Sequence, residues 1–495
     1  MRYVRLLLAV ILFASTSIAQ EKGYSIKVKI EGVKDTVCYL AGYYGPKQYY
    51  KDTADVDAQG NMIFAGDDSL PGGIYSVVLP DKKTYFEFIV TEQFFTLETI
   101  KGDQPTMTKN MKISGSKENA SFYEYLGFIG GMQQKAGPWR KAVSDSLATD
   151  EKKKEAREKL NEIDKQVKEY KKKFMEEHSD LFVSKIFKTS EEPDVPGKAD
   201  WPILPNGRKD STFPRRYYVG HFWDGVDFSD ERLIRTPVMH NKIEKFIKKV
   251  TVQHPDSICK AAFYLADKAR ANKEIFKYVV HYVTNTYEKS KIMGMDAVFV
   301  CMAEKYYLTG DAYWIDSTRM EKIKERARKL GNTLIGYKTP NVILQDTSET
   351  KWHNLYDVNA KYTVLYFWDS GCGHCKKETP KLKKLYDEMK GKNVEVFAVG
   401  TEFKNEEWKK YIREKELNWI NISDNPEINK NAAKYLHLTT LESLNFRDTY
   451  DLYSTPKVFL LDEDKKIVAK QLSVEQLGEM LGNLLKKEEK KNESN

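Results

Sequence analysis

The N-terminal part of the chain alternates hydrophobic and polar residues. From Ser25 to Ile30 every second residue is apolar, which is typical of a strand with one buried face. Turn segments rich in Gly, Pro, Asn and Asp separate this strand from further short strand-like runs. Those runs cover 37–40, 62–65, 74–79, 84–90 and 94–100. Short strands at this spacing predict an all-β, sandwich-like domain, which we place at 20–115.

Beyond residue 116 the hydrophobic residues recur at steps of three and four, which indicates amphipathic helices. One helix face carries a row of apolar side chains, while Lys and Glu fill the other faces. The row consists of Leu160, Ile163, Val167, Tyr170 and Phe174. It is either the seam of a coiled-coil homodimer or a packing surface for neighbouring helices of the same chain. Because the pattern is short, we favour packing within the chain, with a homodimer through the helical domain as the alternative.

A Pro-rich segment interrupts the helical part at 191–216, where we expect a long ordered loop. Helical periodicity returns at 242 and continues to 330. The sequence therefore predicts a middle all-α domain over 116–333.

Strands and helices alternate in the last third of the chain. The predicted order is strand 363–368, helix 372–390, strand 394–399, helix 405–416, strands 457–461 and 466–470, and a closing helix at 474–485. This alternation predicts a C-terminal α/β domain, 334–487, whose partly parallel sheet is covered by helices on both faces. The charged residues 488–495 are expected to form a disordered tail.

The chain begins with a segment typical of protein export. Arg2 and Arg5 are followed by an apolar run over 6–13 and by the small residues around Ala19. The apolar run is too short for a membrane-spanning helix, and no Cys follows it to carry a lipid anchor. We therefore expect a signal peptide over 1–19, cleaved after Ala19, and a mature protein in the periplasm.

The charge distribution argues against nucleic-acid binding. The chain has 495 residues, with 80 basic and 72 acidic side chains and a net charge of +8. Lys and Glu are interleaved along the predicted helices, as expected for solvated faces. A nucleic-acid-binding surface needs a concentrated basic face with aromatic residues between the charges, and no stretch has this pattern.

The chain has five cysteines, too few to hold a protein of this length together by disulfides. Cys38 lies in a predicted strand, and we interpret it as a buried small hydrophobic residue. Cys259 and Cys301 lie in helical segments. We expect them to be two separate buried thiols, because sequence alone rarely fixes a disulfide pairing.

The remaining two cysteines, Cys372 and Cys375, lie where a predicted strand ends and a helix begins. The free N–H groups and the positive end of the helix dipole favour a thiolate at Cys372, and His374 adds a polar neighbour. Cys375 lies one turn further on, more buried and close enough to form a disulfide with Cys372. Glu378, one turn beyond Cys375, is the expected acceptor of the proton that Cys375 must lose.

Two other functions for a CxxC pair are disfavoured. A structural zinc needs two paired groups of ligands, and no second CxxC or HxxxH is present, so we expect neither a metal nor another cofactor. Peroxidase chemistry requires one exposed sulfur that is oxidised and then resolved elsewhere, whereas these two cysteines are adjacent by construction. Disulfide exchange is the reading that uses both thiols.

The C-terminal domain resembles the thioredoxin fold, and in particular the exported thiol-disulfide oxidoreductases of the TlpA/ResA type. The resemblance rests on Phe367-Trp368 before the motif, on the two cysteines, on the segment Lys376 to Pro380 after it, and on Ser454-Thr455-Pro456 before a later strand. It implies that Thr455 and Pro456 form the cis-proline loop that pairs with an extended substrate segment. It also implies that Trp368 takes part in substrate binding.

One position departs from thioredoxin itself. Thioredoxins carry a buried Asp on the strand before the motif, where this chain has Tyr366. The resemblance to the TlpA/ResA type implies that Glu378 takes over the proton transfer at Cys375.

These observations predict an exported thiol-disulfide oxidoreductase that reduces disulfides of client proteins through a mixed disulfide. A membrane thiol reductase would have to supply its electrons. A disulfide oxidase or isomerase is an alternative within the same chemistry. A binding module that only recognises thiol partners is an alternative outside it.

The two preceding domains resemble uncharacterised β-rich and helical domains found before thioredoxin modules in exported proteins. They would either dock a partner, for example through aromatic pairs such as Tyr49-Tyr50, or act as a spacer that presents the redox domain.

Overall fold

The computed structural model describes residues 22–402 and 405–492. The chain divides between Phe246 and Ile247 into two compact units, so the division falls inside the region predicted as one helical domain. The expected signal peptide, 1–19, lies outside the described residues. None of the described helices has an apolar stretch long enough to cross a bilayer.

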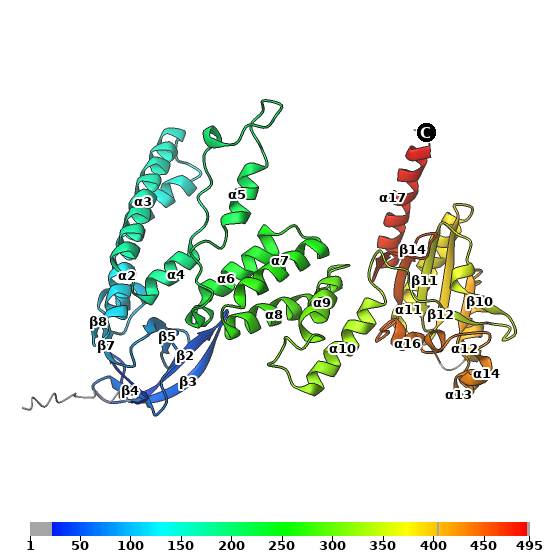
Figure 1. Cartoon of the computed structure of the whole chain (residues 1–495), viewed down its shortest axis with the longest axis horizontal. Coiled ribbons are helices and arrows are strands. Elements are labelled where there is room, and N and C mark those ends of the chain that lie inside the picture. The colour runs from blue at the N-terminus through cyan, green and yellow to red at the C-terminus, as the bar shows by residue number, and fades with distance from the viewer. Residues whose placement is uncertain (1–21, 403–404, 493–495) are drawn as a thin grey trace, which may run out of the picture. The chain divides into compact units, whose positions relative to one another are not determined.

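The first unit begins with two four-stranded sheets, which confirms the all-β prediction (Figure 1). Their strand orders are β4-β1-β7-β8 and β3-β2-β5-β6. The strands are β1 (Tyr24–Glu31), β2 (Thr36–Tyr44), β3 (Lys47–Val56), β4 (Asn61–Gly66), β5 (Gly73–Val78), β6 (Tyr85–Val90), β7 (Phe94–Ile100) and β8 (Lys112–Ser114). Alternate residues of both sheets, such as Val28, Leu40 and Phe88, share one core, which makes this part a sandwich. Cys38 is fully buried in that core, as predicted.

Strand β3 has no counterpart among the predicted strands. It pairs with β2 at the edge of its sheet and exposes most of its side chains, including Tyr49 and Tyr50. An edge strand that faces water lacks the apolar alternation by which strands are recognised in a sequence.

Helices complete the first unit. The long helices α2 (Lys117–Ser144) and α3 (Asp150–Glu177) lie side by side (Figure 1). Tyr170 and Phe174 of α3 pack against Phe128 and Tyr125 of α2, so this end of the apolar face packs within the chain, as we favoured. The shorter helices are α1 (Gln104–Lys109), α4 (Phe182–Ser190), α5 (Phe213–His221) and α6 (Pro237–Lys245).

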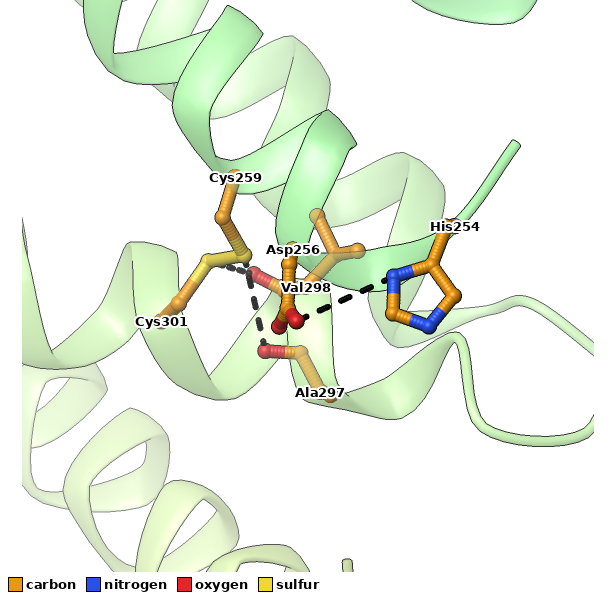
Figure 2. The surroundings of a disulfide bond; sticks show 6 residues. All are labelled: His254, Asp256, Cys259, Ala297, Val298 and Cys301. Carbon is orange, nitrogen blue, oxygen red and sulfur yellow. Dashed lines mark hydrogen bonds and ion pairs between the residues drawn. A yellow bond between two sulfur atoms is a disulfide. The ribbon is translucent and has the colours of Figure 1, made fainter. Parts of the chain in front are cut away.

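The second unit opens with a helical part. We call its helices the helical region: α7 (Pro255–Ala269), α8 (Lys273–Glu288), α9 (Asp296–Met302) and α10 (Ser317–Gly331). A disulfide between Cys259 of α7 and Cys301 of α9 joins two of them (Figure 2). The expectation of two separate buried thiols was therefore wrong. The helices bring the cysteines to a Cα–Cα distance of 6.5 Å although 42 positions separate them in the sequence, and both are only half-buried.

The C-terminal part of the second unit is a seven-stranded sheet of order β10-β9-β13-β12-β11-β14-β15, which confirms the predicted α/β domain. Strands β11, β12 and β13 run parallel, and β14 is antiparallel to β11. The strands are β9 (Ile343–Asp346), β10 (Trp352–Asn354), β11 (Tyr362–Trp368), β12 (Val394–Gly400), β13 (Ile420–Ser423), β14 (Lys457–Leu461) and β15 (Ile467–Lys470). The short strands β9, β10 and β13 were not predicted.

Helices cover both faces of this sheet. Residues of α11 (Gly373–Met389), α12 (Asn405–Glu414) and α17 (Val474–Asn492) build one core with the sheet. Four short helices pack on the other face. They are α13 (Pro426–Lys430), α14 (Ala432–Tyr435), α15 (Leu441–Leu444) and α16 (Phe446–Thr449). Strand β11 is buried along its whole length because both of its faces are covered.

The tail differs from the prediction. Helix α17 continues to Asn492, so the residues from 488 to 492 are helical rather than disordered. Their Lys and Glu residues are strong helix formers. Glu488 also accepts a hydrogen bond from the Tyr362 hydroxyl (2.8 Å) and pairs with Lys361 (3.0 Å), which ties this end of the helix to the sheet. The last three residues, 493–495, lie outside the described part of the chain.

Candidate active site

The CxxC motif lies at the carboxyl end of the central strand. Strand β11 ends at Trp368, a short turn follows, and Cys372 is the N-cap residue of α11. Cys372 and Cys375 are both free thiols in the structure. The first helical turn therefore directs its N–H groups towards the sulfur of Cys372.

The two thiols have different surroundings. Cys372 is half-buried, and its thiol donates a hydrogen bond to the Thr455 carbonyl oxygen at 3.4 Å. Cys375 is only 1% exposed, and its sulfur accepts the Asp369 N–H at 3.4 Å. A substrate can reach Cys372, whereas Cys375 can react only with a group that is already attached there.

The pKa values of the two thiols also differ, and the more accessible thiol has the lower one. Partial burial opposes ionisation of Cys372, but hydrogen bonds from the backbone N–H groups of Cys375 and His374 outweigh it, so the pKa of Cys372 is lowered. Burial raises the pKa of Cys375 to about 12, although the Asp369 N–H stabilises its thiolate. The thiolate form is therefore favoured at Cys372 and disfavoured at Cys375.

The cis-proline loop, which we define as residues 451–456, lies beside the motif. The Thr455-Pro456 peptide bond is cis, and both residues are half-buried. Strand β14 follows immediately and pairs Lys457 with Phe367 of β11, which fixes the loop next to the end of the central strand. The sequence resemblance had implied a cis-proline loop at Thr455 and Pro456, and the structure has the cis bond there.

Trp368, which the resemblance had placed in substrate binding, has no exposed side-chain surface in the structure. Its side chain is fully buried in the core under α11 and α12, where its ring lies against those of Tyr366 and Tyr411. The strand is covered on both faces up to its last residue, so a side chain at this position points into the core. Trp368 thus packs in the same core cluster as Cys375.

The hydrogen bonds of Glu378 are to residues other than the two cysteines. Its carboxylate accepts hydrogen bonds from Lys381 Nζ at 2.8 Å and from the Val474 N–H, at the start of α17, at 3.3 Å. The hydroxyl of Tyr366, which bonds Thr379 at 2.9 Å, lies within electrostatic range of both Cys375 and Glu378. The His374 side chain is exposed, and its described effect on Cys372 comes from its backbone N–H.

A second carboxylate near the motif, Glu402, was missed in the sequence. It follows β12 and accepts the Ser370 N–H, two residues before Cys372. Its other oxygen is buried and receives no hydrogen bond from the described residues. Burial raises the pKa of Glu402 to about 7, and the neighbouring Asp369 carboxylate adds to the rise. A group with this pKa can accept a proton near neutral pH.

The position of Glu402 follows from sheet pairing. Trp368 of β11 pairs with Gly400 of β12, so the residues that follow the two parallel strands meet at the same edge. A carboxylate just after the second predicted strand was the available signal. Its burial could not be predicted without the strand order.

Three family models match the chain. The AhpC/TSA family model matches residues 335–470, a range that includes both cysteines and the cis-proline loop. Two domains of unknown function match the preceding parts, DUF4369 over 24–122 and DUF5106 over 149–331. The helical and β-rich parts thus match domains to which no function is assigned.

Known proteins resemble the chain over part of its length. It is 30% identical over 154 residues to the thiol-disulfide oxidoreductase ResA of Bacillus thuringiensis, which covers 31% of this chain and 78% of the relative. A solved domain of a possible thiol-disulfide isomerase from Cytophaga hutchinsonii is 40% identical and covers 32% of this chain and 97% of its own, with a TM-score of 0.26. A thioredoxin-like protein from Bacteroides caccae is 20% identical and covers 57% and 96%, with a TM-score of 0.41.

Proposed function

This chain belongs to the ResA-type thiol-disulfide oxidoreductases, and on that premise we propose that its Cys372–Cys375 dithiol reduces disulfides of exported client proteins in the periplasm. The observation that carries the proposal is the asymmetry of the two thiols. One is accessible, has a lowered pKa and lies against the cis-proline loop, and the other is buried with a raised pKa. This is the arrangement that a two-step exchange requires.

In the first step the Cys372 thiolate attacks one sulfur of the client disulfide. A Cys372–client disulfide forms, and the other client sulfur leaves as a thiolate that takes up a proton. The backbone of Thr455 and Pro456 holds the extended client segment during the attack. Hydrogen bonds from the N–H groups of the first turn of α11 lower the pKa of Cys372 and so favour the thiolate that attacks.

In the second step Cys375 loses its proton and attacks the Cys372 sulfur. The Cys372–Cys375 disulfide forms, and the second client thiolate leaves. Two electrons have then passed from the dithiol to the client disulfide. We assign Glu402 as the proton acceptor for Cys375, because its pKa of about 7 lets it take up a proton near neutral pH and because it accepts the Ser370 N–H beside the motif. The carboxylate of Glu378 accepts its hydrogen bonds from Lys381 and the Val474 N–H instead.

A Cys375→Ser variant of the full chain tests the catalytic proposal. It keeps the nucleophile but cannot release the client, so a disulfide-bonded peptide should accumulate as a covalent adduct on Cys372. The matched control is Cys372→Ser, which keeps only the buried thiol and should form no adduct. A protein that acts purely as a binding module would retain the peptide without the covalent bond, and the adduct would be absent from mass spectra in denaturant.

The direction of electron flow has its own test. The lowered pKa of Cys372 stabilises the dithiol form, which is the property that makes some thioredoxin-like proteins oxidants, so an oxidase or isomerase is the second candidate. Equilibration of the full chain with glutathione buffers gives the reduction potential of the pair. A reductant should have a potential below about −230 mV, and a value near −120 mV would assign it as an oxidase. The proposed electron source is a membrane thiol reductase.

A further inference from the structure

Helix α10 of the helical region reaches the segment that leads into the cis-proline loop. The Arg328 guanidinium pairs with the Asp448 carboxylate at 2.6 Å, and Lys329 pairs with the same carboxylate at 2.6 Å. Arg326 pairs with the carboxylate of Asp451, the first residue of the loop. Three basic residues in the last turns of one helix thus contact two acidic residues that lie shortly before Thr455 and Pro456.

Asp451 is held from two directions. Its side chain is only 5% exposed and contacts Arg326 of α10. Its backbone carbonyl accepts a hydrogen bond from Lys457 Nζ at 2.8 Å, and the neighbouring Tyr450 carbonyl accepts a second one at 2.8 Å. Its φ of 51° lies in the left-handed region, which Asp adopts more readily than most residues other than Gly and Asn. The loop therefore starts from a restrained residue.

Helix α10 is itself fixed to the sheet. Lys470 of β15 is buried, donates to the Thr333 carbonyl just after α10 at 2.6 Å, and pairs with Asp296 of α9. The chain leaving α10 also pairs with the sheet edge, where the Gly336 N–H donates to the Ile467 carbonyl at 2.8 Å. Helix α10 is therefore tied to the sheet at one end while its basic residues contact the loop.

We propose that α10 positions the cis-proline loop for an extended polypeptide substrate, with Arg326 and Asp451 as the positioning residues. This inference rests on the proposed function, because it concerns how the client segment binds beside Cys372. The loop presents Tyr453, which is 78% exposed and near Arg326, as an apolar surface next to Thr455. A small disulfide needs only Cys372, whereas a polypeptide disulfide also needs the loop.

The test compares two substrates in the full chain. Arg326→Gln should raise the KM for a disulfide-bonded peptide about tenfold, about 1.4 kcal/mol, and leave its kcat within twofold. Turnover of a small aryl disulfide should stay within twofold of wild type. The reduction potential of the pair should not change, because neither cysteine loses a contact. Arg326→Lys keeps the charge and should restore much of the peptide KM.

Two further variants control for folding and for charge. Lys324→Gln removes an exposed charge of the same helix, which pairs with Glu321 of α10. It should change the KM and the turnover of neither substrate. Asp451→Asn keeps the shape of the side chain and tolerates the left-handed conformation. It should raise the KM for the peptide as Arg326→Gln does. The double variant Arg326→Gln/Asp451→Asn should raise this KM no further than either single variant.

The outcomes separate this inference from the proposed function. If wild type reduces neither substrate, the proposed function is wrong. If wild type reduces both but Arg326→Gln and Asp451→Asn leave the peptide KM unchanged, the positioning role is overturned. An equal loss of activity on the peptide and on the small aryl disulfide would also overturn it, because the substitution would then have altered Cys372 itself.

Discussion

The sulfur atoms of Cys372 and Cys375 differ in exposure and in pKa, which predicts selective alkylation. Brief treatment of the reduced protein with iodoacetamide at pH 7 should label Cys372 and spare Cys375, because the thiolate is the reacting form. The labelling rate of Cys372 should reach half its maximum below the pH of about 8.5 expected for a free cysteine. Peptide mass spectrometry measures both, and equal labelling of the two thiols would contradict the site as described.

Glu402 and Glu378 make opposite predictions for the second step. If Glu402 accepts the proton of Cys375, Glu402→Gln should slow client release from the mixed disulfide about 100-fold near pH 7. Glu378→Gln, which loses contacts to Lys381 and Val474 only, should slow it less than threefold. Rapid-quench measurement of the mixed disulfide distinguishes them. The reverse ranking would return the role to Glu378.

The raised pKa of Glu402 also predicts a pH dependence of stability. Its pKa is about 7 in the folded protein against 4.5 in an unfolded chain, so the folded state holds more protons between these values. Stability should therefore fall as the pH rises from about 4.5 to about 7. Chemical denaturation of wild type and Glu402→Gln should show this fall in wild type and a weaker dependence in the variant.

Single residues were predictable from the sequence where the chemistry is local. The ionisation of Cys372 depends on the first turn of its own helix, and the sequence places it there. The burial of Trp368 and the pKa of Glu402 depend on elements that are distant in the chain. The local sequence around the motif therefore indicated neither the burial of Trp368 nor a role for Glu402.

At the scale of elements, the disulfide between α7 and α9 makes a stability prediction. It closes a loop of 42 positions, for which loop-closure entropy gives a stabilisation of about 2–4 kcal/mol. The Cys259→Ser/Cys301→Ser variant should lose free energy of unfolding in that range. Denaturant titration of the full chain measures the loss, and an unchanged midpoint would mean that packing of α9 alone holds the two helices together.

The same scale explains which elements could be predicted. Strand β11 and helix α11 have strong patterns because one is wholly buried and the other amphipathic. Strands β3, β9 and β10 are short or exposed, so pairing with a neighbour defines them rather than their own sequence. Helix α17 ran past its predicted end because Glu488 finds partners in Tyr362 and Lys361, which lie far away in the sequence.

For the whole molecule, the sequence predicts export. Expression in a Gram-negative host should yield a mature chain that begins at Gln20, released by osmotic shock, because cleavage after Ala19 removes the apolar run. N-terminal sequencing of the released protein measures this. Replacing Leu7 and Leu8 by Asp, a change confined to the cleaved segment, should retain the precursor in the cytoplasm. A precursor that stays uncleaved in the wild type would contradict the export prediction.

The domain organisation was partly predictable. The three types of architecture follow from the spacing of apolar residues. This spacing is two residues in the first part and three or four in the middle part, and segments of both kinds alternate in the last part. The contact of α10 with the segment before the cis-proline loop could not be predicted, because Arg326 and Asp451 look like ordinary surface charges in the sequence. That contact favours an active role for at least part of the helical region over a simple spacer.

The half-exposed Cys259–Cys301 bond has a practical consequence for anyone who handles this protein. The reagents that convert the Cys372–Cys375 pair to its working dithiol form, excess dithiothreitol above all, act on every accessible disulfide in the tube. A sample prepared in this way is a mixture of chains that keep the α7–α9 bond and have three free thiols, and chains that have lost it and have five. Counting thiols before each assay, and re-oxidising or desalting to a defined number, decides which of these molecules a measured rate describes.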